Sequence, residues 1–192
     1  EKEITCKQGD VKAVGKGSRE VKDMGIESKG MSSHKIYGAK GIGALFIRKG
    51  VRIDDYMHGG AQENNRRAGT ENLAGIVGFG KAAQLAKENF DAHVKHSSQM
   101  RDYLKDRILS EIPDTFVNGT MDGRHPGNLN VTFEYIEGES ILLLLNQFGI
   151  SVSTGSACSS QSLEQSHVLA ALVVTEEMIH GTVRFTVGDM TK

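Results

Sequence analysis

The stretch SSHKIYGAKGIG, at residues 32–43, is the most informative part of this 192-residue sequence. In it Lys35 follows two serines and a histidine and precedes a run of glycines, which predicts a turn lined with hydroxyl and imidazole donors. A lysine in a glycine-rich turn is most often only a solvated surface charge. A Schiff-base lysine, in contrast, must lose its proton near neutral pH and must stand where donors can hold an anionic group. Ser32 and His34 lie close enough in sequence to supply such donors.

A second stretch, STGSACSS at residues 153–160, surrounds Cys158 with small and hydroxyl-bearing residues. A free cysteine in such company is commonly an inert core residue that packs as a small hydrophobic group. The polarity of this stretch favours an exposed loop instead, in which a partly ionised thiol can act as a nucleophile. The other cysteine, Cys6, has no comparable setting, and we interpret it as incidental. Neither cysteine has the spacing of a metal site, and a reducing cytoplasm suits both better than a disulfide-bonded secreted fold.

Composition limits the classes of protein to which the chain can belong. Hydrophobic residues make up 38% of it, which is enough for one good core or two small ones, and no apolar run is long enough to cross a bilayer. The formal net charge is −1 and the pI about 6.7, so there is no basic surface to attract nucleic acid or anionic lipid. These features predict a soluble globular protein that binds neither nucleic acid nor membrane.

The first half of the sequence predicts a strand, a polar loop and a long helix. The apolar run ALFIR at residues 44–48 is bounded by turn residues and predicts a buried strand. Thr70, at the end of the polar loop, is the predicted N-cap of a helix over residues 72–109. The buried stripe of this helix is predicted to consist of Leu73, Ile76, Val77, Leu85, Phe90, Val94, Leu104 and Ile108.

Such a helix would connect two domains. We therefore expect residues 1–75 to belong to a larger domain, residues 76–109 to form the connecting helix, and residues 110–192 to form a small C-terminal domain that carries the cysteine loop.

A half-buried strand is predicted at residues 128–133, where apolar and polar residues alternate. Because side chains on a strand point alternately to its two faces, Leu129, Val131 and Phe133 are expected to face a core and the polar residues between them to face outward. A short helix with an acidic first turn is predicted over residues 139–147.

The remaining residues predict one strand, two helices and a last strand. The first strand begins at residues 150–152 and leads directly into the cysteine loop. Short helices are expected near residues 168–172 and 175–180, and a strand follows at residues 182–187. Arg184 is predicted to lie on the polar face of this last strand.

Together, the two motif stretches resemble those of the pyridoxal-phosphate-dependent cysteine desulfurases of the class V aminotransferase family. The match consists of Ser-x-His-Lys, the Tyr-Gly-x-Lys-Gly-x-Gly-Ala pattern that follows it, and Ser-x-Gly-Ser-Ala-Cys downstream. It extends over about residues 8–188 and corresponds to the second half of a family member. The resemblance implies an α/β protein of the PLP-dependent transferase fold type I, represented by the end of the large domain and a small C-terminal α+β domain.

The resemblance also implies which residues hold the cofactor. Lys35 would form the Schiff base with pyridoxal 5'-phosphate, and Ser32 and His34 would contact its phosphate. Asp10 corresponds, with a one-residue deletion, to the aspartate that pairs with the pyridinium nitrogen. Thr70 corresponds to the threonine that reaches the cofactor phosphate of the neighbouring subunit, which implies a homodimer with shared sites.

The same resemblance assigns chemical roles to Cys158 and Arg184. Cys158 would attack the sulfur of the substrate, become a persulfide and carry the sulfur to an acceptor. Arg184 would bind the substrate carboxylate through its planar guanidinium, whereas the residue pattern alone equally allows an ordinary surface salt bridge. The implied reaction converts L-cysteine into L-alanine and supplies sulfur to an iron–sulfur scaffold protein or to tRNA thiolation.

Two other functions fit the same residues. The sequence contains no counterpart of the phosphate loop, stacking histidine and asparagine that the family carries upstream, so we expect weak or no activity from this chain alone. A truncated, non-catalytic homologue would act as a sulfur-acceptor or scaffold-binding module through the surface around Cys158. A selenocysteine-lyase-like enzyme of the same class would release alanine from selenocysteine, and that reaction would not require Cys158.

Overall fold

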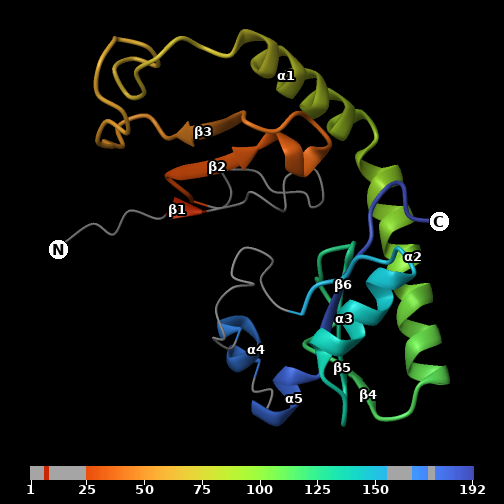
Figure 1. The fold of residues 1–192 in the computed structure, drawn as a ribbon. Helices are drawn as coiled ribbons and strands as arrows, with labels where there is room; N and C mark the ends of the chain where they lie inside the picture. The colour runs from red at the N-terminus through yellow and green to blue at the C-terminus, as the bar shows by residue number, and fades with distance from the viewer. Residues whose placement is uncertain (1–6, 9–24, 155–165, 173–175) are drawn as a thin grey trace. The chain divides into compact units, whose positions relative to one another are not determined.

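The computed structural model of the chain describes residues 7–8, 25–154, 166–172 and 176–192. The chain divides into two compact units, Glu1–Phe90 and Asp91–Lys192 (Figure 1). Asp10 and Cys158, two of the predicted site residues, lie outside the described residues. The three-part domain division expected from the sequence stays a prediction.

The first unit contains a three-stranded sheet formed by β1 (Lys7–Gln8), β2 (Ser28–Ser32) and β3 (Gly43–Ile47). β2 lies in the middle, parallel to β1 and antiparallel to β3. The 3-10 helix η1 (Ser33–Ile36) follows β2 directly.

The strand predicted at residues 44–48 is therefore present as β3, but the prediction that it is buried is wrong. All but the last residue of β3 are exposed. The buried core of this unit forms elsewhere, because Ile36 of η1 packs against Ala82 and Ala86 of the following helix, with the partly buried Phe79 beside them.

The single long helix predicted over residues 72–109 is two helices, α1 (Leu73–Glu88) and α2 (Phe90–Glu111). Asn89 separates them, since both its backbone N–H and its side-chain Nδ2 donate to the Leu85 carbonyl oxygen at 3.0 Å and end α1 there. The N-cap is also not Thr70. Asn72 takes that role, because its Oδ1 accepts a hydrogen bond of 3.0 Å from the Gly75 N–H.

The buried stripe predicted for this region is wrong in α1 and correct in part of α2. Leu73 and Val77 are more than 70% exposed, whereas the small residues of α1 face the core. In α2, Ile108 is buried and Leu104 packs against the core of the second unit.

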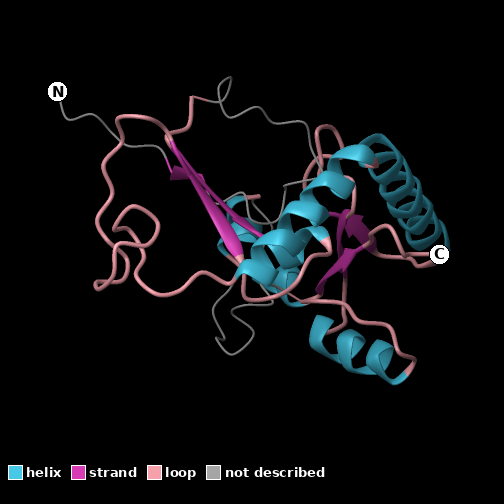
Figure 2. Ribbon diagram, turned by 90° about the horizontal axis from the view of Figure 1, so that it is seen from above, coloured by secondary structure: helices cyan, strands magenta, loops and turns pink. Residues whose placement is uncertain are grey.

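The second unit is built on a three-stranded antiparallel sheet in the order β4 (Thr115–Val117), β5 (Asn128–Phe133) and β6 (Thr182–Thr186). α2 runs beside this sheet (Figures 1 and 2). The core lies between them and contains the buried residues Ile108, Leu129, Val131, Phe133 and Val183. The prediction that the apolar residues of β5 face a core is confirmed.

Three helices complete the second unit: α3 (Gly138–Gln147), α4 (His167–Ala171) and α5 (Glu176–His180). They match the predicted helices to within a few residues. The strand predicted at residues 150–152 is absent, and the chain forms only an isolated bridge there, at Ser153.

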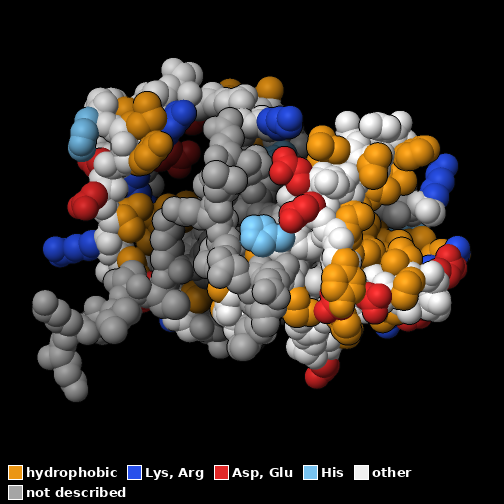
Figure 3. Space-filling view, turned by 60° about the horizontal axis from the view of Figure 1, so that its bottom comes forward, with side chains coloured by type: hydrophobic (Ala, Val, Ile, Leu, Met, Phe, Trp, Pro, Cys, Tyr) orange, Lys and Arg blue, Asp and Glu red, His pale blue; other side chains and the backbone are white. Residues whose placement is uncertain are grey.

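Several large hydrophobic side chains of this unit are exposed, and Figure 3 shows such side chains interspersed with charged ones over the visible surface. Leu143, Leu144, Phe148 and Ile150, in and just after α3, are among them. No helix in the described part of the chain combines the length and the hydropathy that crossing a membrane requires.

The polar face of β5 and β6 differs from the prediction. Thr132 is predicted to face outward but is 0% exposed, and Thr182 opposite it is 1% exposed. Their hydroxyl oxygens lie 3.0 Å apart in register on neighbouring strands, and Thr182 donates to the Met178 carbonyl of α5 at 3.0 Å. At Thr132 and Thr182 the second face of the sheet is therefore also covered, by polar contacts.

Candidate active site

The lysine of the first motif stands in a short turn at the end of a strand. β2 ends at Ser32, and His34 and Lys35 follow in the single turn of η1. The Gly38 N–H donates to the Ser33 carbonyl at 3.0 Å, and the Ser33 N–H donates to the Ile42 carbonyl at 3.1 Å. The structure thus brings Ser32, His34 and Lys35 together, with His34 exposed and Lys35 partly buried.

Glycine is required at two points of this turn. A Cβ on Gly38 would lie 2.1 Å from the Ser33 hydroxyl oxygen, and a Cβ on Gly43 would lie 2.6 Å from the Met31 carbonyl oxygen. Both distances are far below contact distance, so a side chain at either position would push the turn open. The Ser33 hydroxyl itself is buried and has no hydrogen-bond partner in the described residues. The local sequence therefore dictates a tight turn that holds Lys35 at its edge.

Thr70 lies at the end of a loop that is closed by its own hydrogen bonds. The Ala68 N–H donates to the Met57 carbonyl at 3.1 Å, and the Gly69 N–H donates to Gln62 Oε1 at 3.1 Å. Arg67 Nη1 donates to the Gly69 carbonyl at 3.2 Å. Thr70 follows directly and is exposed. Its side chain is available to a neighbouring molecule.

Arg184 belongs to β6 and is joined to the start of the cysteine stretch. The Arg184 N–H donates to the Ser153 carbonyl at 2.6 Å, and the Ser153 N–H donates to the Arg184 carbonyl at 3.2 Å. The Arg184 side chain is partly buried, and its guanidinium has no hydrogen bond or ion pair with any described residue. Thr154 continues from this bridge and packs its methyl group toward Gly138. Cys158 follows four residues later in the sequence.

Sequence reasoning missed a polar network on the same face of this sheet. Asn118, just after β4, donates through Nδ2 to Asn130 Oδ1 at 2.7 Å and to Thr132 Oγ1 at 2.8 Å. Thr132 in turn meets Thr182. The alternation of residues 128–133 predicts Asn130 and Thr132 on one face, but it assigns them to solvent and says nothing of Asn118.

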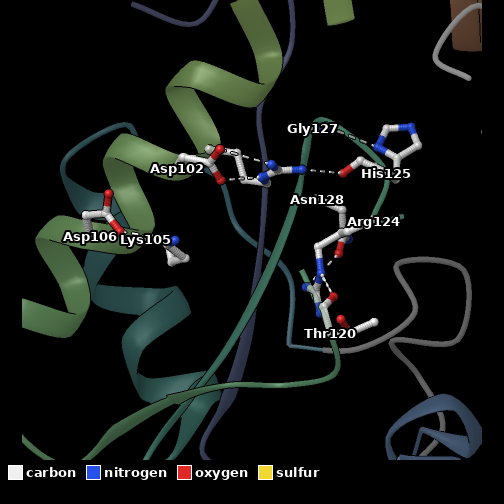
Figure 4. Close-up of polar contacts among 9 residues, drawn as sticks. Asp102, Lys105, Asp106, Thr120, Arg124, His125, Gly127 and Asn128 are labelled. Carbon is white, nitrogen blue, oxygen red and sulfur yellow. Dashed lines mark hydrogen bonds and ion pairs between the residues drawn. The ribbon is translucent and has the colours of Figure 1, made fainter. Parts of the chain in front are cut away.

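A cluster of arginines ties the connection between β4 and β5 to α2 (Figure 4). Arg101 of α2 forms a bidentate pair with Asp102 at 2.9 and 3.1 Å and donates to the His125 carbonyl at 3.3 Å. Arg124 donates through Nε to the Thr120 carbonyl at 2.8 Å.

The pKa values of this cluster follow from the contacts. Burial, and then repulsion by Arg101, lower the pKa of Arg124. The hydrogen bond from Arg101 lowers the pKa of Asp102. The cluster holds a loop in place through backbone carbonyls, and this role is structural.

Comparison with solved structures defines the fold class of the chain. Solved structures of similar fold include NifS-like proteins, and the chain has the α/β fold of the PLP-dependent transferases of fold type I. A NifS-like protein from Rickettsia africae superposes with a TM-score of 0.86 at 25% identity, over 97% of this chain and 49% of that one. The structure titled SspA in complex with cysteine superposes with a TM-score of 0.70 at 30% identity, over 94% of this chain and 49% of that one.

Residues 10–190 match the family model of the aminotransferase class-V proteins, and the chain belongs to this family. The cysteine desulfurase IscS of Dictyoglomus turgidum is 51% identical over 181 residues, which are 94% of this chain and 46% of that protein. The chain thus spans about half the length of the curated relatives that it matches. The family resemblance noted from the two motif stretches is confirmed.

The residues around Lys35 fit the cofactor that this family implies. A lysine amine, a serine hydroxyl and an imidazole within one turn provide a covalent attachment point and donors for a phosphate. The turn lies at the end of a strand and is partly open to solvent, which leaves room for an incoming group.

Proposed function

We propose that the protein to which this chain belongs is a pyridoxal-phosphate-dependent cysteine desulfurase, which converts L-cysteine into L-alanine and leaves the sulfur as a persulfide on Cys158. The observation that carries this proposal is the bridge between Arg184 and Ser153. It places a partly buried guanidinium without a partner in the described residues at the root of the segment that holds Cys158. The names of the relatives, and the cysteine bound by SspA, support the choice of substrate.

Pyridoxal phosphate, when bound, would supply an electron-withdrawing ring that stabilises negative charge at the Cα of the substrate. Lys35 would hold the cofactor covalently, and Ser32 and His34 would donate to its phosphate. Asp10 would pair with the ring nitrogen, and Thr70 would contact the phosphate in the neighbouring subunit. This last role calls for a homodimer.

Each chemical step has a residue of this chain to perform it. Arg184 would bind the substrate carboxylate through two parallel hydrogen bonds, and this orients the Cα–H bond. The Lys35 amine, when it is not bound to the cofactor, would take the proton from Cα.

The thiolate of Cys158 would then attack the substrate sulfur. A sulfur–sulfur bond forms, the carbon–sulfur bond breaks, and its electron pair stays with the substrate carbon, which is protonated to give L-alanine. Cys158 lies five positions after Ser153 in the sequence. Because an extended chain of that length spans at most about 17 Å, the Arg184 bridge limits how far the sulfur can travel.

The acceptor of the sulfur would be a thiol of an iron–sulfur scaffold protein or of the tRNA thiolation machinery. The outer sulfur atom of the persulfide must be transferred from Cys158 before the next turnover, so the protein needs such a partner. A reducing cytoplasm is the compartment in which Cys158 remains a thiol between turnovers.

Reduction with borohydride in the presence of pyridoxal phosphate tests the cofactor site. We expect mass mapping of the full chain to find a pyridoxyl group on Lys35, and Lys35→Ala to abolish it. Lys40 is the matched control, because it is exposed five residues further along the same glycine-rich stretch, and Lys40→Ala should leave the labelling unchanged. Equal labelling of both lysines, or persulfide acquired by Cys158 from a partner protein without any label on Lys35, would contradict the proposal.

A further inference from the structure

We propose that Asn130 is a second donor to the substrate carboxylate, beside Arg184, and that Asn118 is the residue that positions its amide. The inference deepens the proposed function and rests on the role of Arg184 in it. It arises from a row of side chains that crosses the sheet of the second unit.

Three strand pairings define this row. Asn130 of β5 is directly opposite Arg184 of β6 in the antiparallel register, and Arg184 is bridged to Ser153 on its other side. Asn118 continues the β4–β5 register opposite Asn130, and its N–H donates to the Asn130 carbonyl at 3.0 Å. Residues that lie opposite each other in an antiparallel ladder project their side chains from the same face, with Cβ atoms about 5 Å apart. Asn130 and Arg184 are therefore close neighbours on one face.

A chain of hydrogen bonds fixes which way the Asn130 amide points. The Met178 carbonyl can only accept, so the Thr182 hydroxyl donates to it at 3.0 Å. The single hydroxyl hydrogen of Thr182 is used in that bond. The 3.0 Å contact between the two hydroxyls therefore requires Thr132 to donate and Thr182 to accept. Thr132 must in turn accept from Asn118 Nδ2, at 2.8 Å.

The second hydrogen of Asn118 Nδ2 points to Asn130, at 2.7 Å, and the atom that it meets has to be an acceptor. This atom is Oδ1. The Asn130 Nδ2, with two hydrogens, lies on the other branch of the amide and has no acceptor among the described residues. The longer contact of 3.2 Å between Thr132 Oγ1 and Asn118 Oδ1 competes for the same Thr132 proton and does not reverse the order.

Two donors without acceptors among the residues that the structure describes therefore lie on the same face of the sheet. Neither a guanidinium nor an amide NH2 group can accept a hydrogen bond, so Arg184 and Asn130 cannot satisfy each other. A carboxylate can satisfy both, because its two oxygens offer about four acceptor sites in one plane. The pair accordingly selects substrates that carry a carboxylate, and Asn130 shares that selection with Arg184.

The test follows the side-chain N–H signals of Asn130 and Arg184 by NMR in the full chain during titration with L-alanine, the product of the proposed reaction. Ethylamine, which lacks the carboxylate, is the control ligand. We expect L-alanine to shift both signals with the same midpoint and ethylamine to shift neither. Asn130→Asp should raise the midpoint for Arg184 roughly tenfold, because a carboxylate would then occupy the guanidinium.

Asn128→Asp is the matched variant, since it adds the same charge on the same face of β5, opposite Thr186, and should change the midpoint less than about twofold. Asn118→Asp tests the positioning role. It replaces the donor by an acceptor, so the Asn130 NH2 group should turn toward it and stop responding to L-alanine, while Arg184 still responds.

The two proposals fail in different ways. If L-alanine shifts Arg184 but not Asn130, or if Asn130→Asp behaves like Asn128→Asp, the inference is wrong and the proposed role of Arg184 stands. If neither signal responds to L-alanine, the carboxylate site itself is wrong, and the inference falls with it.

Discussion

The lysine turn of the first unit and the arginine row of the second are built in opposite ways. The turn is closed within a dozen consecutive residues, by contacts such as that from the Gly38 N–H to the Ser33 carbonyl. The row is assembled from Asn118, Asn130, Ser153 and Arg184, which only strand register brings together. The difference teaches that a local motif can reveal an anchor for a cofactor, whereas the binding face for a substrate depends on the completed sheet.

The largest expected loss of stability is in the second unit. A Cβ at Gly181, between α5 and β6, would lie 2.1 Å from the Phe133 carbonyl oxygen and 3.0 Å from that of Ile136. Both atoms belong to the backbone and cannot rotate away, so Gly181→Ala should lower the free energy of unfolding by about 3 kcal/mol. Unfolding by denaturant measures this loss of stability. Gly78→Ala, at an open position of α1, is the control and should raise stability by roughly 0.5–1 kcal/mol.

The corresponding substitution in the lysine turn should lower the free energy of unfolding by less, and a second substitution should restore part of the loss. Gly38→Ala places a Cβ 2.1 Å from the Ser33 hydroxyl oxygen, and we expect a loss of about 2 kcal/mol. Because a side-chain atom causes the clash, removing it in the double variant with Ser33→Ala should restore part of the loss. A double-mutant cycle with no coupling between the two positions would show that the turn is not closed in this way.

Ser33→Ala alone should stabilise the first unit. The hydroxyl is fully buried without a hydrogen-bond partner in the described residues, and an unmade hydrogen bond of this kind costs about 1 kcal/mol. The expected gain is of that size, measured by thermal or denaturant unfolding. A loss of stability would mean that the hydroxyl has an acceptor in the folded protein.

The smallest effect concerns acid stability in the second unit. The hydrogen bond from Arg101 lowers the pKa of Asp102 below its usual 3.8. A lowered pKa in the folded state means that the contribution is present above pH 3.8 and is lost as the pH falls toward the folded value. Unfolding curves of Asp102→Asn should therefore converge with those of the original chain at low pH. Curves that stay parallel down to pH 2 would rule out this linkage.

Local features were predicted from the sequence more accurately than the burial of side chains was. The motif around Lys35, the strand at residues 128–133 and the short helices follow from spacing and turn residues, and all are present. The burial of β3, the stripe of α1 and the outward direction of Thr132 were wrong. Burial depends on which element packs against a face, and periodicity carries no information about that partner.

The same limit applies to the candidate site. The spacing of β6 placed Arg184 on a polar face, but the pairing with Asn130 and the bridge to Ser153 depend on register between distant segments. The break at Asn89 was missed for a related reason, since a helical pattern continues across it and one asparagine ends α1 by bonding back to Leu85.

The most direct measurement follows both products of one turnover. The whole protein to which this chain belongs, with pyridoxal phosphate, is mixed with L-cysteine, and alanine and the persulfide on Cys158 are quantified together by mass spectrometry. We predict one alanine released per persulfide formed, and loss of both in Cys158→Ala. Alanine released by the Cys158→Ala variant at the original rate, or persulfide on Cys158 without alanine, would contradict a desulfurase that uses Cys158 as its nucleophile.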